Sequence, residues 1–130
     1  MSFPRAFLLT AIVYAVIGMA MGIYMGITGN FAPSPVHAHI NLVGWVSLAL
    51  FGLMHRAFPR LRAHGLATIQ FWVAEAGALL LPIGIWLKLF HDSEPVVIIG
   101  SLLTLGAMLL FLVMAISGVR DQESGVGPRS

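Results

Sequence analysis

The stretch AFLLTAIVYAVIGMAMGIYMGITGNFAPSPVHAHINLVGWVSLALFGLMH, residues 6–55, contains no Asp, Glu, Lys or Arg. Soluble domains depend on charged side chains for much of their exposed polar surface, so a stretch of this length cannot cover a water-facing globule. The 130-residue chain as a whole is 58% hydrophobic and 9% charged, whereas soluble domains are about a quarter charged. A soluble fold and a disordered chain are both excluded.

Four segments are long and apolar enough to cross a hydrocarbon core, which takes roughly 20 helical residues. They lie at about 6–27, 37–56, 66–90 and 95–119. The connections between them are short and contain Gly, Pro or polar residues, which forces neighbouring helices to run antiparallel. The sequence therefore predicts an all-α integral membrane protein, one domain folded as an up-down four-helix bundle. Residues 120–130 are predicted to form a flexible tail.

The basic residues indicate an orientation in the bilayer. Arg56, Arg60 and Arg62 flank the second connection, and Arg5 and Arg120 lie at the outer ends of the first and last segments. By the positive-inside rule, both termini and the second connection are predicted to be cytoplasmic. Seven basic residues in this arrangement do not point to a nucleic-acid partner.

Polar residues gather at the start of the second segment, where His37, His39 and Asn41 fall within its first two turns. Polar groups in a membrane are costly enough to be functional hypotheses. At ~100° per residue, His39 points almost opposite to His37. The face of His37 carries Asn41, Gly44, Leu48, Gly52 and His55.

An imidazole near the outer membrane face is a candidate axial ligand of haem or a ligand of Zn or Cu. The alternative is an interfacial histidine bonded to water or a headgroup. His91 is predicted at the same depth, because its helix runs outward, and it is a candidate second ligand or an exposed loop residue. The chain has no cysteine, which removes thiolate ligands.

Two further features carry alternatives. Gly18, Gly22 and Gly26 leave one stripe of the first helix bare, which favours close helix packing or clearance for a flat cofactor. Glu75 is predicted near mid-membrane. We expect a structural acid hydrogen-bonded to a neighbour such as Tyr14 or Ser47, with a proton relay as the alternative.

The run His39-Ile40-Asn41-Leu42, followed by Gly44-Trp45, Phe51-Gly52-Leu53-Met54 and Phe58-Pro59, resembles the second helix of the haem-copper oxidase catalytic subunit. The nearest branches are the C-type oxidases and nitric-oxide reductases. The resemblance covers about residues 37–59. It implies that His39 is an axial ligand of haem b and that Asn41 assists it.

The rest of the family pattern is missing. The sequence has no adjacent His-His pair for copper and no later membrane helix with the opposite haem ligand. The chain is thus similar to the small oxidase-subunit-I-like proteins of bacteria, which implies a bacterial inner membrane location, and a complete oxidase is not expected.

Three hypotheses follow. The first is a haem b protein for electron transfer or gas sensing, with His39 as ligand, a homo-oligomeric state and a redox partner or quinol. The second is a non-haem protein that binds Zn or Cu through His37, His39 and His91. The third is an accessory or scaffold subunit.

Overall fold

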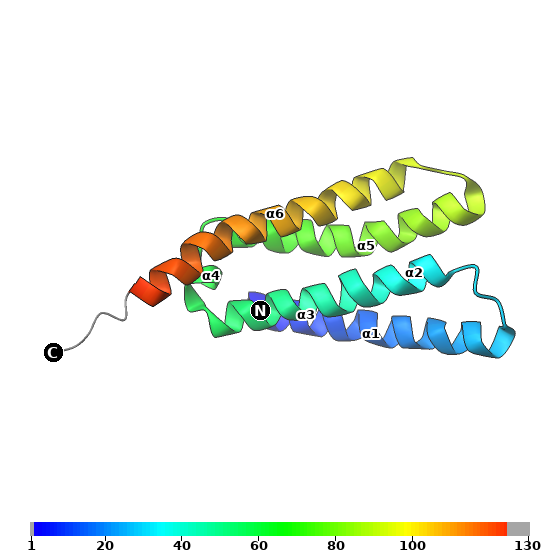
Figure 1. The fold of residues 1–130 in the computed structure, drawn as a ribbon, viewed down its shortest axis with the longest axis horizontal. Helices are drawn as coiled ribbons and strands as arrows, with labels where there is room; N and C mark the ends of the chain where they lie inside the picture. Colours follow the sequence, from blue (N-terminus) through cyan, green and yellow to red (C-terminus); the bar gives the residue numbers. More distant parts are fainter. Residues whose placement is uncertain (1, 125–130) are drawn as a thin grey trace.

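The computed structural model describes residues 2–124, which form helices joined by short connections, with no strand among them (Figure 1). The helices, in chain order, are α1 (Phe3–Thr28), α2 (Ser34–His39), η1 (Ile40–Ser47), α3 (Leu48–Ala57), α4 (Pro59–Ala63), α5 (Ala67–His91) and α6 (Pro95–Ser124). The prediction of an all-α chain is confirmed.

Four helical stretches are long and apolar enough to cross a membrane: Phe3–Thr28, Ser34–Ala57, Ala67–His91 and Pro95–Gly118. The second of these is α2, η1 and α3 in continuous succession. Length and composition thus indicate an integral membrane protein, as the sequence predicts.

The ends of the helices follow local chemistry. Pro4 stands in the first turn of α1, where its missing N–H and fixed φ suit a helix start. Gly29 ends this helix with φ 66°, a left-handed conformation that glycine adopts without strain. Helix α6 continues to Ser124, so residues 120–124 of the predicted tail are helical, and residues 125–130 lie outside the described part of the chain.

The helices form two antiparallel hairpins that lie side by side (Figure 1). In the first hairpin α1 packs along η1 and α3, and in the second α5 packs along α6. The N-terminus, α4 and the end of α6 lie at one end of the molecule, while the α1–α2 connection and the α5–α6 turn lie at the other (Figure 1). Successive long helices therefore alternate in direction.

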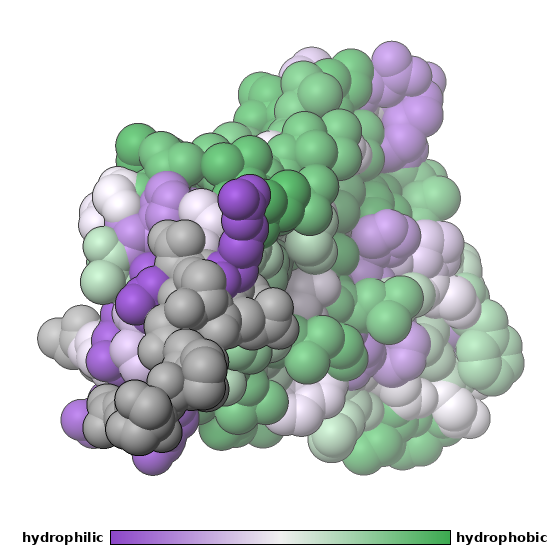
Figure 2. Space-filling model, turned by 60° about the vertical axis from the view of Figure 1, so that its left-hand side comes forward, coloured by the Kyte–Doolittle hydropathy of each residue, from purple (hydrophilic) through white to green (hydrophobic). Residues whose placement is uncertain are grey.

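Aromatic side chains from both hairpins fill the core. The Phe7 ring meets the Phe71 ring edge-on at a centroid distance of 4.8 Å, and the rings of Phe51 and Phe111 lie 4.7 Å apart. Large apolar side chains also cover the outer faces of the helices, where green dominates (Figure 2). Such a surface suits lipid and not water.

Three glycines bring α5 and α6 into close contact. A methyl group on Gly84 would meet the backbone of Val97, one on Gly100 the backbone of Leu81, and one on Gly77 the backbone of Thr104. The two backbones touch directly at these points, as is common between membrane helices.

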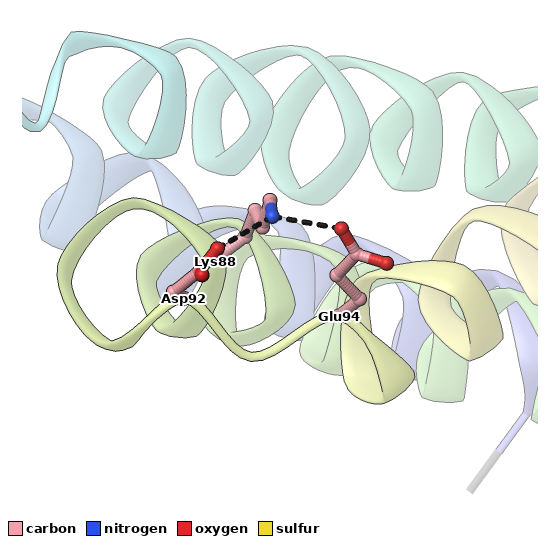
Figure 3. A network of polar contacts seen from close by, with 3 residues as sticks. All are labelled: Lys88, Asp92 and Glu94. Atoms are coloured by element: carbon pink, nitrogen blue, oxygen red, sulfur yellow. Dashed lines mark hydrogen bonds and ion pairs between the residues drawn. The ribbon is translucent and has the colours of Figure 1, made fainter.

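An ion-pair network closes the turn between the same two helices (Figure 3). Lys88 Nζ lies 2.7 Å from Asp92 Oδ1 and 2.7 Å from Glu94 Oε1. Hydrogen bonding to this ammonium lowers the pKa of both carboxyl groups from their ordinary values. The network joins the last turn of α5 to the residue that precedes α6.

Candidate functional site

The second membrane-spanning stretch is not a regular α-helix. Residues Ile40–Ser47 form a π-helix between two α-helical pieces. The Ser47 hydroxyl donates to the carbonyl of Leu42, five residues earlier, at 2.8 Å. Such widened segments are rare and occur frequently at functional sites. The three polar residues singled out by the sequence lie immediately before this segment or in its first turn.

His37 faces α1. Its Nδ1 lies 2.8 Å from the carbonyl oxygen of Gly18, and because a carbonyl only accepts, Nδ1 carries the proton and Nε2 keeps the lone pair. Its ring also covers Gly22, since a methyl group there would lie 3.0 Å from the ring Cε1. The bare stripe of α1 therefore makes room for this imidazole.

Asn41 lies beside His37 on the same face. Its amide Nδ2 donates to the His37 carbonyl at 2.8 Å. The further contact of 3.4 Å between Asn41 Nδ2 and His37 Nδ1 joins two donors and is no hydrogen bond, because the Nδ1 proton points to Gly18. A methyl group on Gly18 would lie 2.5 Å from Asn41 Nδ2. The helical-wheel prediction that His37 and Asn41 share one face is confirmed.

His39 is held by its own helix. Its Nδ1 lies 2.7 Å from the carbonyl of Pro35, one turn earlier. The carbonyl again fixes the proton on Nδ1, which leaves Nε2 as a free donor of an electron pair. His39 is only partly buried, and the exposed side chains of Leu42, Val46 and Leu50 follow it along the helix.

His91 is the last residue of α5 and is exposed. The end of α5 lies at the same end of the molecule as α2 (Figure 1), but no hydrogen bond joins His91 to another side chain within residues 2–124. In that part of the chain, no group of three His, Asp or Glu side chains is placed to hold a metal ion. The fold thus does not gather His37, His39 and His91 into one such group.

Glu75 lies in the middle of α5, in an open groove of about 370 Å³ beside α1. The Thr10 hydroxyl donates to its Oε1 at 2.7 Å. The expectation that a neighbour hydrogen-bonds this acid is confirmed, but the partner is Thr10 and not Tyr14 or Ser47: Ser47 bonds its own helix, and the ring of Tyr14 covers Gly44.

A sequence signal for these contacts exists in α1. The four-residue spacing of Gly18 and Gly22 continues backward to Tyr14 and Thr10, so these four residues form a stripe that winds gradually round the helix. In the structure Gly18 meets Asn41, and Gly22 meets His37. Tyr14 meets Gly44, and Thr10 meets Glu75. The contact of His39 with the Pro35 carbonyl could also be predicted from the sequence, because Pro35 lies one helical turn before His39.

Comparisons of this chain with family models, with curated proteins and with solved structures found no match.

Proposed function

We propose that this protein binds haem b through His39 and serves electron transfer or the sensing of a diatomic gas. One observation carries the proposal: the Pro35 carbonyl holds His39 Nδ1 at 2.7 Å, which leaves Nε2 with a lone pair at the surface of the helix. Histidines that bind metals are oriented in this way by a hydrogen bond from the other ring nitrogen. His37 has the same protonation state, but its ring is packed against α1.

The sequence pattern supports the same residue. His39 occupies the position of the haem ligand in the oxidase-like run that ends at Pro59. The chain has no adjacent histidine pair for a copper site, so oxygen reduction at a binuclear centre is not part of the proposal. Bound haem supplies either reversible one-electron chemistry or a coordination position for a gas, depending on the second axial ligand.

The space for the group lies outside the bundle. The cavity between the hairpins, beside Val43 and Ala74, holds only about 20 Å³. His39 instead lies on a side of the helix with exposed Leu42 and Val46. A flat apolar ring would pack against these apolar side chains. A second copy of the chain would cover the other side of the ring, which favours a homo-oligomer. A redox partner or quinol would supply or accept the electrons.

The orientation belongs to the same proposal. Arg5, Arg56, Arg60 and Arg62 lie at the end of the molecule that holds the N-terminus and α4. By the positive-inside rule this end is cytoplasmic, and His39 lies toward the opposite, outer face. A bacterial inner membrane fits this arrangement.

An optical spectrum tests the proposal. We expect the protein purified in detergent from haem-replete cells to show a Soret band. His39→Ala should remove this band, and added imidazole should restore it by filling the vacated ligand position. His37→Ala serves as the control, because its ring is committed to α1, and this variant should keep the band. His91→Ala should alter the band only if His91 supplies the second ligand.

Two results would contradict the proposal. A wild-type protein without a Soret band but with stoichiometric Zn or Cu would favour the second hypothesis of the sequence, metal binding at outer-face histidines. A colourless and metal-free protein would favour an accessory or scaffold role.

A further inference from the structure

A second candidate site lies at the opposite end of the bundle from His39. It is a cavity of about 450 Å³ between the start of α1, the end of α3 and α4. Its lining consists of Ser2, Pro4, Arg5, Leu8, Leu9, Arg56 and Arg62. Figure 2 brings this end forward and shows hydrophilic residues collected there beside a hydrophobic shaft. The haem proposal assigns no role to this cavity.

A glycine contact brings two of the arginines together. A methyl group on Gly52 would lie 3.0 Å from the carbonyl of Pro4 and 3.0 Å from Leu8 Cγ, so α1 and α3 touch at this point. Arg5 follows directly from this contact on one helix, and Arg56 lies one turn beyond Gly52 on the other. The short helix α4 then adds Arg62.

The described lining of the cavity is strongly basic. Among the residues that the structure describes, it contains three guanidinium groups and no carboxylate. Like charges that share a site repel one another unless an anion balances them. The N-terminus of α1 adds to the positive potential, because the Ser2 side chain makes no capping bond there and the first N–H groups of a helix attract anions.

The lining also has an apolar side. Leu8 and Leu9 continue the cavity down the shaft of α1, and the side chain of Leu9 is 45% exposed. A small soluble anion would make no favourable contact with these apolar side chains, whereas the acyl chain of a lipid would pack against them. The arginines mark the level of the headgroup, since they stand at the end of the membrane-spanning stretch that finishes at Ala57.

We propose that this cavity is a binding site for an anionic phospholipid. Its phosphate lies among Arg5, Arg56 and Arg62, and one acyl chain runs along Leu8 and Leu9. Guanidinium groups bind phosphate oxygens through paired hydrogen bonds. Attraction of a lipid to a general basic surface involves no such pairing. The lipid would contact α1, α3 and α4 together.

Titration with lipid tests the site. The purified full chain in a neutral detergent is titrated with phosphatidylglycerol, with zwitterionic phosphatidylcholine, or with inorganic phosphate alone, and the rise in melting temperature gives the apparent Kd. We expect a response to phosphatidylglycerol and little response to the other two. Arg62→Gln should weaken this binding roughly fivefold, and the pair Arg56→Gln with Arg62→Gln roughly 25-fold.

Arg60→Gln is the matched control. Arg60 lies in α4 with Arg62 and is also exposed, but it does not line the cavity. Its loss should change the apparent Kd less than about twofold, although it removes the same charge. Arg62→Lys keeps the charge without the paired donors and should fall between wild type and Arg62→Gln. Helical circular dichroism confirms that each variant is folded.

Two outcomes would overturn the assignment. Equal losses for Arg60→Gln and Arg62→Gln would show attraction to general surface charge and no defined site. A response to inorganic phosphate as strong as that to phosphatidylglycerol, with the same dependence on Arg62, would replace the lipid by a soluble phosphate compound. Neither outcome depends on whether haem is bound.

Discussion

At the residue scale, Asn41 and His37 both contact Gly18 of α1. Asn41 donates to the His37 carbonyl at 2.8 Å and fills the space above Gly18. The imidazole in turn donates to the Gly18 carbonyl. The amide needs the glycine, because any side chain on Gly18 would take the volume that the amide occupies.

Gly18→Ala should therefore displace Asn41 and lower the stability of the protein. The added methyl group would lie 2.5 Å from Asn41 Nδ2, so the amide must move and its hydrogen bond is lost. We expect a loss of about 1–2 kcal/mol, measured by thermal unfolding in detergent.

Gly26→Ala is the control for this prediction. Gly26 belongs to the same stripe, but no atom lies within 4 Å of a methyl group built on it. Alanine should therefore be neutral there, or stabilising because it favours the helix. Equal effects of Gly18→Ala and Gly26→Ala would show that the stripe contacts something other than Asn41.

Helix contacts at the element scale differ between the two hairpins. In the first hairpin Gly18 and Gly22 of α1 receive side chains from the π-helix and the helix before it, whereas in the second the backbones of α5 and α6 touch directly. Gly84 makes the closest of these contacts, against Val97. A backbone cannot move aside as a side chain can, because the whole helix must shift.

Gly84→Ala should thus separate α5 from α6 at this point. We expect destabilisation of about 1–3 kcal/mol, the usual cost of overpacking, seen as a lower melting temperature. Gly106→Ala is the matched control on α6, because its methyl group would lie 3.9 Å from the nearest atom, Val73 Cγ1. A melting temperature unchanged by Gly84→Ala would contradict the direct backbone contact.

At the scale of the whole molecule, two buried polar side chains lie where the hairpins meet and affect the stability of the bundle. His55 and Gln70 are both fully buried, and their four side-chain polar atoms have no hydrogen-bond partner among the described residues. The His55 ring is stacked on Phe7 with a centroid distance of 5.7 Å. The His55 ring therefore gains from aromatic packing, whereas the Gln70 amide makes no hydrogen bond of ordinary geometry among the described residues.

Gln70→Leu should raise the stability of the assembled bundle. A buried polar group without a partner costs about 1–3 kcal/mol, and leucine fills a similar volume. We expect the melting temperature to rise by about 3 °C.

Thr68→Leu, at an exposed position of the same helix, provides the comparison and should have no effect. A lower melting temperature for Gln70→Leu would show that the amide is satisfied in the folded protein, by His55 or by bound water.

The sequence alone determined the class of this protein. A stretch of fifty residues without a charge, four apolar segments and short connections leave only antiparallel membrane-spanning helices, because a bilayer admits few other structures. Helical periodicity also placed His37 and Asn41 on one face. These features are local, since they depend on composition and on residues one or two turns apart.

Only the tertiary structure decided what this face meets. The carbonyl that binds His37 comes from a residue 19 positions away, and the hydroxyl that binds Glu75 from one 65 positions away. The π-helix and the cavity shared by Arg5, Arg56 and Arg62 are equally absent from the pattern. The physical reason is that the rotation and separation of packed helices depend on all the side chains at their contacts, which periodicity within one helix does not specify.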